Sequence, residues 1–290
     1  MHYKEVKGIL SARNGMNVFR GCTHGCIYCD SRSRCYQINH NFEDVEVKIN
    51  APELLEAALR KKRGKCMIGT GAMCDPYIPE EAQLNHTRKC FEIIERYGFG
   101  LAVQTKSDLI LRDTDLLLSI NQKAKCAVQM TLTTYDEDLC KIIEPNVCTT
   151  KRRFEVLKIL NEAGIKTVVW LSPFLPYIND TRENIEGLLD YIVRAKVYGI
   201  ITFGIGLTLR DGNREYYYEN LNRHFPQLTE KYIRKYGNMY EIKSDNEGEL
   251  SGLIIDICKK HGILYDRAAV FNFLGEFPHT PEPEQLSLWG

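Results

Sequence analysis

Three cysteines at short, fixed spacing are the residues of this chain with the clearest capacity for chemistry. Cys22, Cys26 and Cys29 are separated by three and then two residues, in a segment that also contains Gly21 and Gly25. Glycine allows backbone conformations that let such a loop curl, so that three sulfur atoms converge. Thiolates are favoured ligands of zinc and of iron–sulfur clusters. The spacing therefore predicts a metal centre at this loop.

An iron–sulfur cluster fits the three ligands better than a zinc ion does. A structural zinc site needs a fourth ligand, which here would be His24 or Cys35, and His24 is confined between two of the cysteines. A cubane cluster with three thiolates keeps one iron open, and an open iron can bind a small molecule and pass it an electron. Three unligated thiols in one loop would be a reactive liability. The remaining cysteines form no closely spaced pair, so no second cluster is expected.

The elements that must position this loop follow a repeating pattern of a strand-like run and then a helix-like run. The expected strands cover residues 16–20, 66–70, 101–105, 126–132, 166–171 and 200–209, and the expected helices cover residues 52–62, 81–97, 113–123, 151–163 and 182–197. This alternation predicts an α/β fold with a parallel sheet covered by helices. Six units suit a partial (β/α)6 TIM-type barrel or a doubly wound sheet. Either one places chemistry at the C-terminal ends of the strands.

Composition indicates an ordinary globular protein of 290 residues. Hydrophobic residues make up 44% of the chain, and 38 basic residues balance 38 acidic ones. The zero net charge removes the simplest argument for nucleic-acid binding, although a local basic groove is compatible with it. The first ten residues carry charges and no apolar core, and no apolar run reaches about 18 residues, so we expect neither a signal peptide nor a membrane span. We predict a cytoplasmic protein whose 11 cysteines are thiols or metal ligands rather than disulfides.

Polar motifs follow the later strands as well as the first. They are Gly69–Glu80, Thr105–Ser107 with Arg112–Asp113, Thr131–Asp136 leading to Glu144–Pro145 and Arg153, and Pro173–Asp180. Together with Asn17–Cys29, in which Tyr28 precedes the third cysteine, they resemble the radical S-adenosylmethionine (SAM) superfamily. Within it they are similar to the spore photoproduct lyase-like branch, which is related to DNA-repair photolyases. The resemblance covers roughly residues 10–210.

This resemblance implies an enzyme with two cofactors, a [4Fe–4S] cluster and SAM. In the family, SAM binds the open iron, and an electron from a reductant such as flavodoxin or ferredoxin cleaves it. The resulting 5′-deoxyadenosyl radical abstracts a hydrogen atom from a substrate. The cofactors carry the difficult chemistry, and the protein orients and shields them.

The resemblance and the strand ends together indicate a set of cofactor contacts. The candidates are Tyr28, Gly71, Asp75, Lys106, Thr131 and Thr133. Asp75 or a backbone carbonyl near Gly71 is expected to accept from the SAM ammonium, and Lys106 to pair with the SAM carboxylate. Thr131 and Thr133 alternate along a strand, so we expect them to share its inner face. Simpler interpretations exist as well. Gly71 and Asp75 could form an ordinary βα turn, and Lys106 could be a solvated loop lysine. The two threonines could be present only because threonine favours strands.

Two further features of the strand ends are open to two interpretations each. Cys74 is a candidate catalytic residue, because in spore photoproduct lyase a cysteine of this region returns a hydrogen atom to the product radical; the register differs here, and a partly buried thiol is the alternative. Glu144 and Arg153 are expected to form a buried salt bridge that is structural rather than catalytic.

The pattern changes after the sixth strand, and we divide the chain into a core barrel (residues 1–210), a helical extension packed on it (211–276) and an extended tail (277–290). Arg214–Phe225 interleaves aromatic and cationic residues, which could contact nucleic acid or pack on the barrel. Gln285–Trp289 resembles the peptide by which bacterial repair proteins dock on the DNA sliding clamp. It could instead pack on its own barrel.

Three functions remain open from the sequence. The first is a radical SAM enzyme that acts on a nucleic-acid lesion, and the second is one that acts on a small molecule or peptide. The third is a non-enzymatic iron–sulfur adaptor that docks through its tail.

Overall fold

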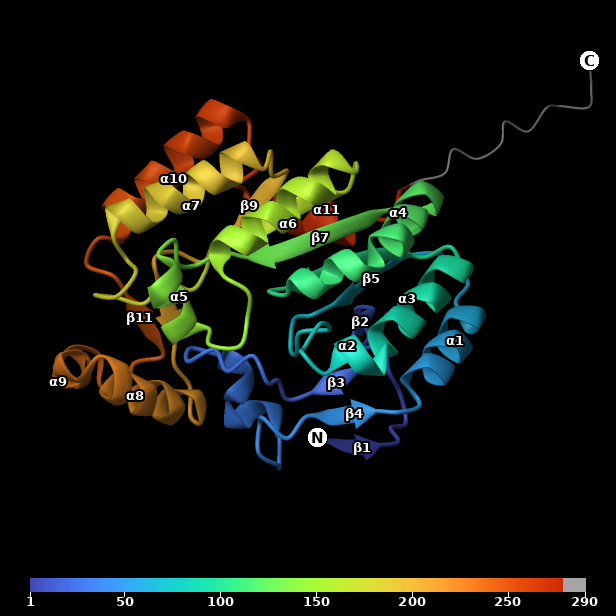
Figure 1. Cartoon of the computed structure of the whole chain (residues 1–290), viewed down its shortest axis with the longest axis horizontal. Helices are drawn as coiled ribbons and strands as arrows, with labels where there is room; N and C mark the ends of the chain where they lie inside the picture. Colours follow the sequence, from blue (N-terminus) through green and yellow to red (C-terminus); the bar gives the residue numbers. More distant parts are fainter. Residues whose placement is uncertain (279–290) are drawn as a thin grey trace, which may run out of the picture.

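The computed structural model describes residues 1–278, and its centre is a six-stranded parallel sheet in which neighbours in space are neighbours in sequence. Its strands are β2 (Gly15–Met16), β5 (Met67–Thr70), β6 (Gly100–Thr105), β7 (Cys126–Thr131), β8 (Lys166–Trp170) and β9 (Gly199–Ile201). The sheet curves, with its helices on the outside (Figure 1). This arrangement confirms the predicted partial TIM-type barrel.

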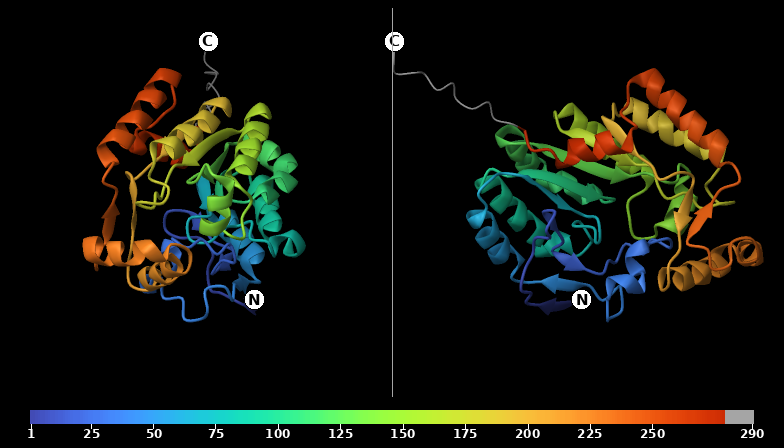
Figure 2. Two further views of the ribbon diagram at one scale, coloured as in Figure 1. Left: turned by 60° about the vertical axis from the view of Figure 1, so that its left-hand side comes forward. Right: turned by 180° about the vertical axis from the view of Figure 1, so that it is seen from behind.

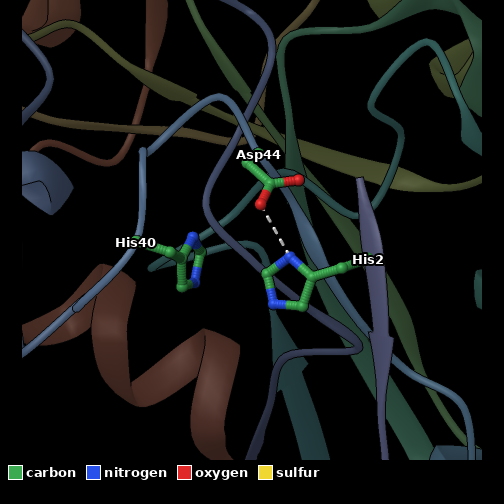
Figure 3. A group of neighbouring side chains, drawn as sticks. All are labelled: His2, His40 and Asp44. Carbon is green, nitrogen blue, oxygen red and sulfur yellow. Dashed lines mark hydrogen bonds and ion pairs between the residues drawn. The ribbon is translucent and has the colours of Figure 1, made fainter.

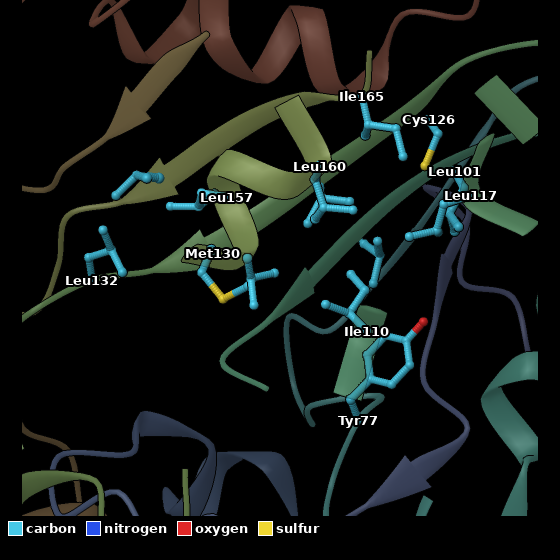
Figure 4. Close-up of a cluster of buried hydrophobic side chains, with 14 of the residues drawn as sticks. Tyr77, Leu101, Ile110, Leu117, Cys126, Met130, Leu132, Leu157, Leu160 and Ile165 are labelled. Atoms are coloured by element: carbon cyan, nitrogen blue, oxygen red, sulfur yellow. The ribbon is translucent and has the colours of Figure 1, made fainter. Parts of the chain in front are cut away.

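Five helices cover the outer face of the sheet. They are α1 (Ala51–Lys61), α3 (His86–Arg96), α4 (Thr114–Lys123), α6 (Thr150–Glu162) and α7 (Arg182–Arg194). In Figure 4, Leu157 and Leu160 of α6 and Leu117 of α4 lie among strand residues such as Leu101 and Met130, and all five are buried. Burial of such side chains is the main stabilising contribution to a fold of this kind.

A short helix, α11 (Arg267–Gly275), closes the inner face of the sheet at its N-terminal end. Val270 and Leu274 of α11 form an apolar cluster with inward residues of five strands. These strand residues are Met67, Ala102, Ala127, Val168 and Ile201. Figure 2 shows α11 lying against the sheet, so this end of the barrel is plugged by apolar contacts.

The first expected strand, residues 16–20, is divided between two sheets. β2 belongs to the central sheet, whereas β3 (Phe19–Arg20) pairs antiparallel with β4 (Glu46–Lys48), which in turn pairs parallel with β1 (His2–Lys4). The expectation of one continuous strand was therefore wrong. Strands of two or three residues are too short to show a period in the sequence.

The sixth expected strand, residues 200–209, is also divided. β9 closes the series of parallel strands, and β10 (Gly206–Thr208) pairs antiparallel with β11 (Glu241–Lys243), a strand that the sequence analysis missed. In the expected helical extension, one helix ends at His224 and Pro226 begins the next, because proline fits a first helical turn but not a helix interior.

The remaining elements connect these layers. They are α2 (Glu81–Leu84), α5 (Glu137–Ile143), α8 (Asn213–His224), α9 (Pro226–Tyr236), α10 (Glu247–His261) and the 3-10 turns η1 (Asp30–Arg32), η2 (Arg34–Tyr36) and η3 (Asp108–Asp113). α10 packs on α7, and α8 contacts η1 beside the N-terminal segment (Figures 1 and 2). None of the helices described here has the length and apolar character to cross a bilayer. The expected clamp-binding peptide, Gln285–Trp289, lies outside the described residues.

Candidate functional site

A cavity of about 100 Å³ lies at the C-terminal ends of β5, β6 and β7. It is lined by the cysteine loop that follows β3 and by the residues just after β5 and β6. All the predicted site residues line it except Tyr28 and Thr133; the lining residues among them are Cys22, Cys26, Cys29, Gly71, Cys74, Asp75, Lys106 and Thr131. The sequence prediction that strand ends gather the chemistry agrees with this geometry.

A larger hollow of about 800 Å³ lies near the opposite end of the strands. It is lined by residues that precede β9, such as Tyr198, and by the connection between α10 and α11, including His261 and Leu264. In β/α architectures the chemistry occurs at the C-terminal ends of the strands. The smaller cavity, which carries the thiols and charges, is therefore the candidate active site.

The spacing of the Cys22, Cys26 and Cys29 sulfur atoms favours a cluster over a single zinc ion. Among the described residues, these three do not bring their sulfur atoms within 4.8 Å of one another. Thiolates on a single zinc ion would lie about 3.8 Å apart, because Zn–S bonds are about 2.3 Å long and tetrahedral. A cubane cluster, in which each thiolate binds a different iron, accepts the wider spacing.

The surroundings of the three thiols shift their pKa values in different directions. Cys74 as a hydrogen-bond donor and His24 as a positive charge hold the pKa of Cys22 well below its ordinary value, although burial opposes this. Burial raises the pKa of Cys26 and Cys29, with Lys106 acting in the opposite direction. Metal ligation by cysteine displaces the thiol proton, and the surroundings favour this more at Cys22 than at Cys26 and Cys29.

The Asp75 carboxylate joins the ends of two strands to the cysteine loop. Oδ1 accepts from the backbone N–H of Tyr77 (2.9 Å) and from Oγ1 of Thr105 (2.7 Å). Oδ2 accepts from the backbone N–H of Lys106 (2.7 Å) and lies 3.4 Å from Nδ1 of His24. A carboxylate has about four acceptor positions, and here each is used by the protein. Asp75 thus has another task than the expected contact with the SAM ammonium.

His24 is the site residue that the sequence analysis misjudged. It was weighed only as a zinc ligand, whereas the structure pairs its buried ring with Asp75. Burial opposes its charged form, but Asp75 and Cys22 raise the pKa of His24 to about 9. The pairing partner lies 51 positions away in sequence, so spacing carried no signal of it.

The Lys106 ammonium points into the cavity without a protein partner. Within residues 1–278, its Nζ makes no ion pair or hydrogen bond, and it lies 5.7 Å from the centre of the Tyr28 ring. Burial opposes its charge, yet Cys26 and Glu144 raise the pKa of Lys106, so it stays cationic. A half-buried cation without a partner has lost part of its hydration, which a ligand of opposite charge can compensate.

Gly71 is required by the close approach of two strand ends. Its φ is 99°, and a Cβ at this position would overlap the carbonyl oxygen of Gln104. The carbonyl oxygens of the next two residues, Ala72 and Met73, accept no hydrogen bond from the described part of the chain. Both residues line the cavity, and their carbonyl oxygens are not used by other described groups of the protein.

The predicted salt bridge between Glu144 and Arg153 is confirmed, and both side chains are fully buried. Arg153 also donates to the carbonyl oxygen of Thr131 (2.8 Å), and the Tyr28 hydroxyl donates to Glu144. Tyr28 is thus linked, through Glu144 and Arg153, to the end of β7. This network explains why Tyr28 does not line the cavity.

Thr133 lies away from the cavity because β7 ends at Thr131 and the expected alternation stops there. The carbonyl oxygen of Thr133 accepts from the side-chain amides of Asn179 and Asn184, at 3.0 Å each. These asparagines tie the segment after β8 to the segment after β7. Thr133 therefore belongs to the support of the site rather than to its wall.

Cys74 and the aromatic-cationic segment also have structural partners. The Cys74 thiol lines the cavity, and its one proton lies within reach of two acceptors, the carbonyl oxygen of Gly21 and the sulfur of Cys22. Tyr217 is fully buried with its hydroxyl on Tyr232, and Arg214 donates to backbone carbonyls near it, including that of Leu209. The packing interpretation of residues 214–225 thus accounts for these two side chains.

Comparison with known proteins agrees with this site. The model of the radical SAM superfamily matches residues 16–192. An uncharacterized protein of Methanocaldococcus jannaschii is 30% identical over 240 residues, which are 82% of each chain, and one of Mycobacterium tuberculosis is 29% identical over 235 residues, 78% of this chain and 68% of that protein.

Solved structures share the fold at low sequence identity. A spore photoproduct lyase mutant superposes with a TM-score of 0.60 and 14% identity, covering 90% of this chain and 79% of its own. Another, with bound AdoMet and dinucleoside spore photoproduct, has a TM-score of 0.59 over 86% and 74% of the two chains. The sulfur spacing, the unpaired Lys106 and the open carbonyls suit the cofactors of this superfamily. The chain belongs to the radical SAM superfamily, and its cofactors are a [4Fe–4S] cluster and S-adenosylmethionine.

Proposed function

We propose that this enzyme abstracts a hydrogen atom from an organic substrate that enters the open side of the partial barrel, with Cys22, Cys26 and Cys29 as the cluster ligands. One observation carries the proposal: three thiols and an ammonium without a partner among residues 1–278 meet at one cavity on the strand ends. When bound together, the cluster and SAM supply reductive cleavage and hydrogen-atom abstraction.

The protein residues have distinct tasks in this proposal. Lys106 offers its ammonium to the SAM carboxylate, and the carbonyl oxygens of Ala72 and Met73 accept from the SAM ammonium. Thr131 offers its hydroxyl from the end of β7. Asp75 holds the cysteine loop and the start of the Lys106 loop in place, so it acts as a positioning residue.

Cys74 is the remaining thiol of the cavity wall among the described residues. Its bond to the Gly21 carbonyl places it next to Cys22 and favours a positioning task over hydrogen return. The variant Cys74→Ala distinguishes a positioning task from hydrogen return. A residue that returns hydrogen is needed only after the substrate has lost its hydrogen atom. Unchanged hydrogen abstraction with an altered product would favour hydrogen return, whereas loss of cluster would favour positioning.

We further propose a nucleic-acid lesion as the substrate class. The motifs of the spore photoproduct lyase-like branch support it, as does the shared fold with a lyase whose structure holds a dinucleoside photoproduct. The tail sequence Gln285–Trp289, which resembles a clamp-docking peptide, points in the same direction. A small molecule or a peptide is the alternative substrate.

The chemistry is tested by anaerobic reconstitution with iron and sulfide, followed by reduction in the presence of SAM. We expect 5′-deoxyadenosine from the wild type and none from Cys22→Ala, which cannot hold the cluster. Lys106→Met should keep the iron content and weaken SAM binding by about tenfold or more, because a bond between charged groups is lost. The control is Lys158→Met, an exposed lysine on the outer helix α6. Equal SAM affinity of the two variants would contradict the role of Lys106.

The substrate class is tested by deuterium transfer. Damaged DNA oligonucleotides with deuterium at the lesion are incubated with enzyme, SAM and reductant, and 5′-deoxyadenosine is examined by mass spectrometry. Label in 5′-deoxyadenosine from the lesion, and none from intact DNA, supports the proposal. Transfer from deuterated small molecules or peptides, but not from DNA, would replace it with the alternative.

A further inference from the structure

Two imidazole rings and a carboxylate face one another at the edge of the N-terminal sheet, outside the active-site cavity. His2 belongs to β1, and His40 and Asp44 belong to the segment that leads into β4 (Figure 3). One ligating atom from each residue lies within 4.8 Å of the other two. In the described part of the chain, no other three His, Cys, Asp or Glu residues bring ligating atoms so close together.

The hydrogen bonding of His40 leaves its Nε2 without a protein partner among the described residues. Its Nδ1 lies 2.9 Å from the carbonyl oxygen of Asn41, and because a carbonyl can only accept, Nδ1 carries the proton. The lone pair of the neutral ring is therefore on Nε2. That atom is buried and has no hydrogen-bond partner within residues 1–278. Histidines that ligate metals typically donate their other ring N–H to a carbonyl or carboxylate in this way.

His2 and Asp44 lie at the spacing of two ligands on one ion. Nδ1 of His2 is 3.0 Å from Oδ2 of Asp44, and the His2 and His40 rings meet edge to face with centroids 4.8 Å apart. Two ligands at about 2.1 Å from one ion lie about 3–3.5 Å apart. The side chains of His2 and Asp44 are 38% and 43% exposed, so rotation can close the remaining distance. Oδ2 of Asp44 is paired with Nδ1 of His2, and an ion bound by both residues would replace this hydrogen bond.

We propose that His2, His40 and Asp44 bind one divalent transition-metal ion of the zinc class, at a site separate from the cluster. Two imidazoles and one carboxylate suit zinc and its first-row neighbours, whereas calcium and magnesium prefer oxygen ligands. Three protein ligands leave a further position for water.

The site is placed to steady the cysteine loop. Phe42, which lies between His40 and Asp44, accepts from the backbone N–H of Cys22 through its carbonyl oxygen at 3.0 Å. Gly21 has a φ of 90°, and a Cβ there would overlap that same oxygen. An ion bound by His40, Asp44 and His2 would restrain the backbone around Phe42. This backbone accepts the hydrogen bond from Cys22, the first cluster ligand.

The test is zinc titration of the reconstituted, cluster-loaded protein without a histidine tag, in which the cluster already occupies the cysteines. We expect one zinc per chain by calorimetry with unchanged iron content. His40→Gln should lower zinc affinity by more than about tenfold, since loss even of a residue that merely orients a ligand costs about 10–100-fold. Asp44→Asn and His2→Gln should act in the same direction. The control is His261→Gln, an exposed histidine of α10.

Hydrogen exchange provides a second measurement that does not depend on activity. Zinc should slow amide exchange in residues 2–4 and 40–46 of the wild type and not in His40→Gln. The proposal would be overturned if the wild type bound no zinc, or if all three variants bound zinc as tightly as the wild type. Zinc uptake accompanied by loss of iron would overturn it too. Unchanged exchange in these segments would overturn it as well.

Discussion

Two buried carboxylates, Asp75 and Glu144, support the candidate active site by different means. Asp75 is surrounded by neutral donors and by His24, and each of its bonds ends on a residue at the cavity or beside it. Glu144 is fully buried against Arg153, with the Tyr28 hydroxyl as a third member. Burial opposes the charge of Glu144, but Arg153 and Lys106 hold the pKa of its carboxyl below the usual value.

This difference separates stability from ligand binding. Removing one partner of a buried ion pair leaves an uncompensated charge, so the Glu144 side of the site should govern folding. The Asp75 side distributes its contacts over the backbone of two loops. Its loss should alter the positions of His24 and Lys106 more than it lowers the free energy of unfolding.

The largest effect is expected from Arg153→Met, which leaves Glu144 buried without its partner. We expect a loss of about 3–5 kcal/mol in the free energy of unfolding, measured by urea denaturation under anaerobic conditions. The carbonyl of Thr131 also loses a donor in this variant. A loss below about 1 kcal/mol would show that the pair does not govern folding.

The double variant Glu144→Leu with Arg153→Met is the matched control. Replacing a buried ion pair by apolar residues of similar volume is often nearly neutral. We therefore expect the second substitution to restore most of the stability lost by the first. If both variants are equally unstable, the cost comes from lost packing rather than from unpaired charge.

A smaller loss of stability and a larger loss of binding are expected from Asp75→Asn. The amide keeps one acceptor oxygen, but its NH2 group cannot accept hydrogen bonds. The two donors that faced the second carboxylate oxygen therefore lose their acceptor. We expect a loss of about 1–3 kcal/mol in stability and a SAM affinity lowered by about tenfold, measured by equilibrium dialysis.

Asp113→Asn provides the comparison for Asp75→Asn. Asp113 is also a buried carboxylate, bonded to Arg88, Arg112 and the Tyr77 hydroxyl, and it does not line the cavity. Its replacement should lower stability and leave SAM affinity unchanged. Equal effects of the two variants on SAM binding would remove the distinction between the carboxylates.

Local spacing was enough to predict the parts of the site that depend on one segment at a time. The cysteine loop, the strand ends at Gly71 and Lys106 and the alternation of strands and helices were all read from short patterns. The Glu144–Arg153 pair was also predicted, from a motif that resembles the family and in which the two residues lie nine positions apart.

The missed features depend on contacts between distant segments or on very short elements. The pairing of His24 with Asp75 and the bond between Tyr28 and Glu144 join residues far apart in sequence. The three-stranded sheet of β1, β4 and β3 contains strands of three residues at most, and such strands have no detectable period. Thr133 does not line the cavity, because β7 ends at Thr131, one residue before the expected end of the strand.

The smallest effect is expected from Tyr28→Phe, which keeps the ring beside Lys106 and removes only the hydroxyl that donates to Glu144. Glu144 retains Arg153, so the loss should be about 1–2 kcal/mol in the free energy of unfolding. Cluster content and SAM affinity should stay unchanged. Tyr217→Phe, which removes another buried hydroxyl, one that donates to Tyr232 and does not line the cavity, is the control. If Tyr28→Phe alone lowers SAM affinity by more than about threefold, its hydroxyl serves the cofactor, and the Glu144 side of the site shares the task assigned to Asp75.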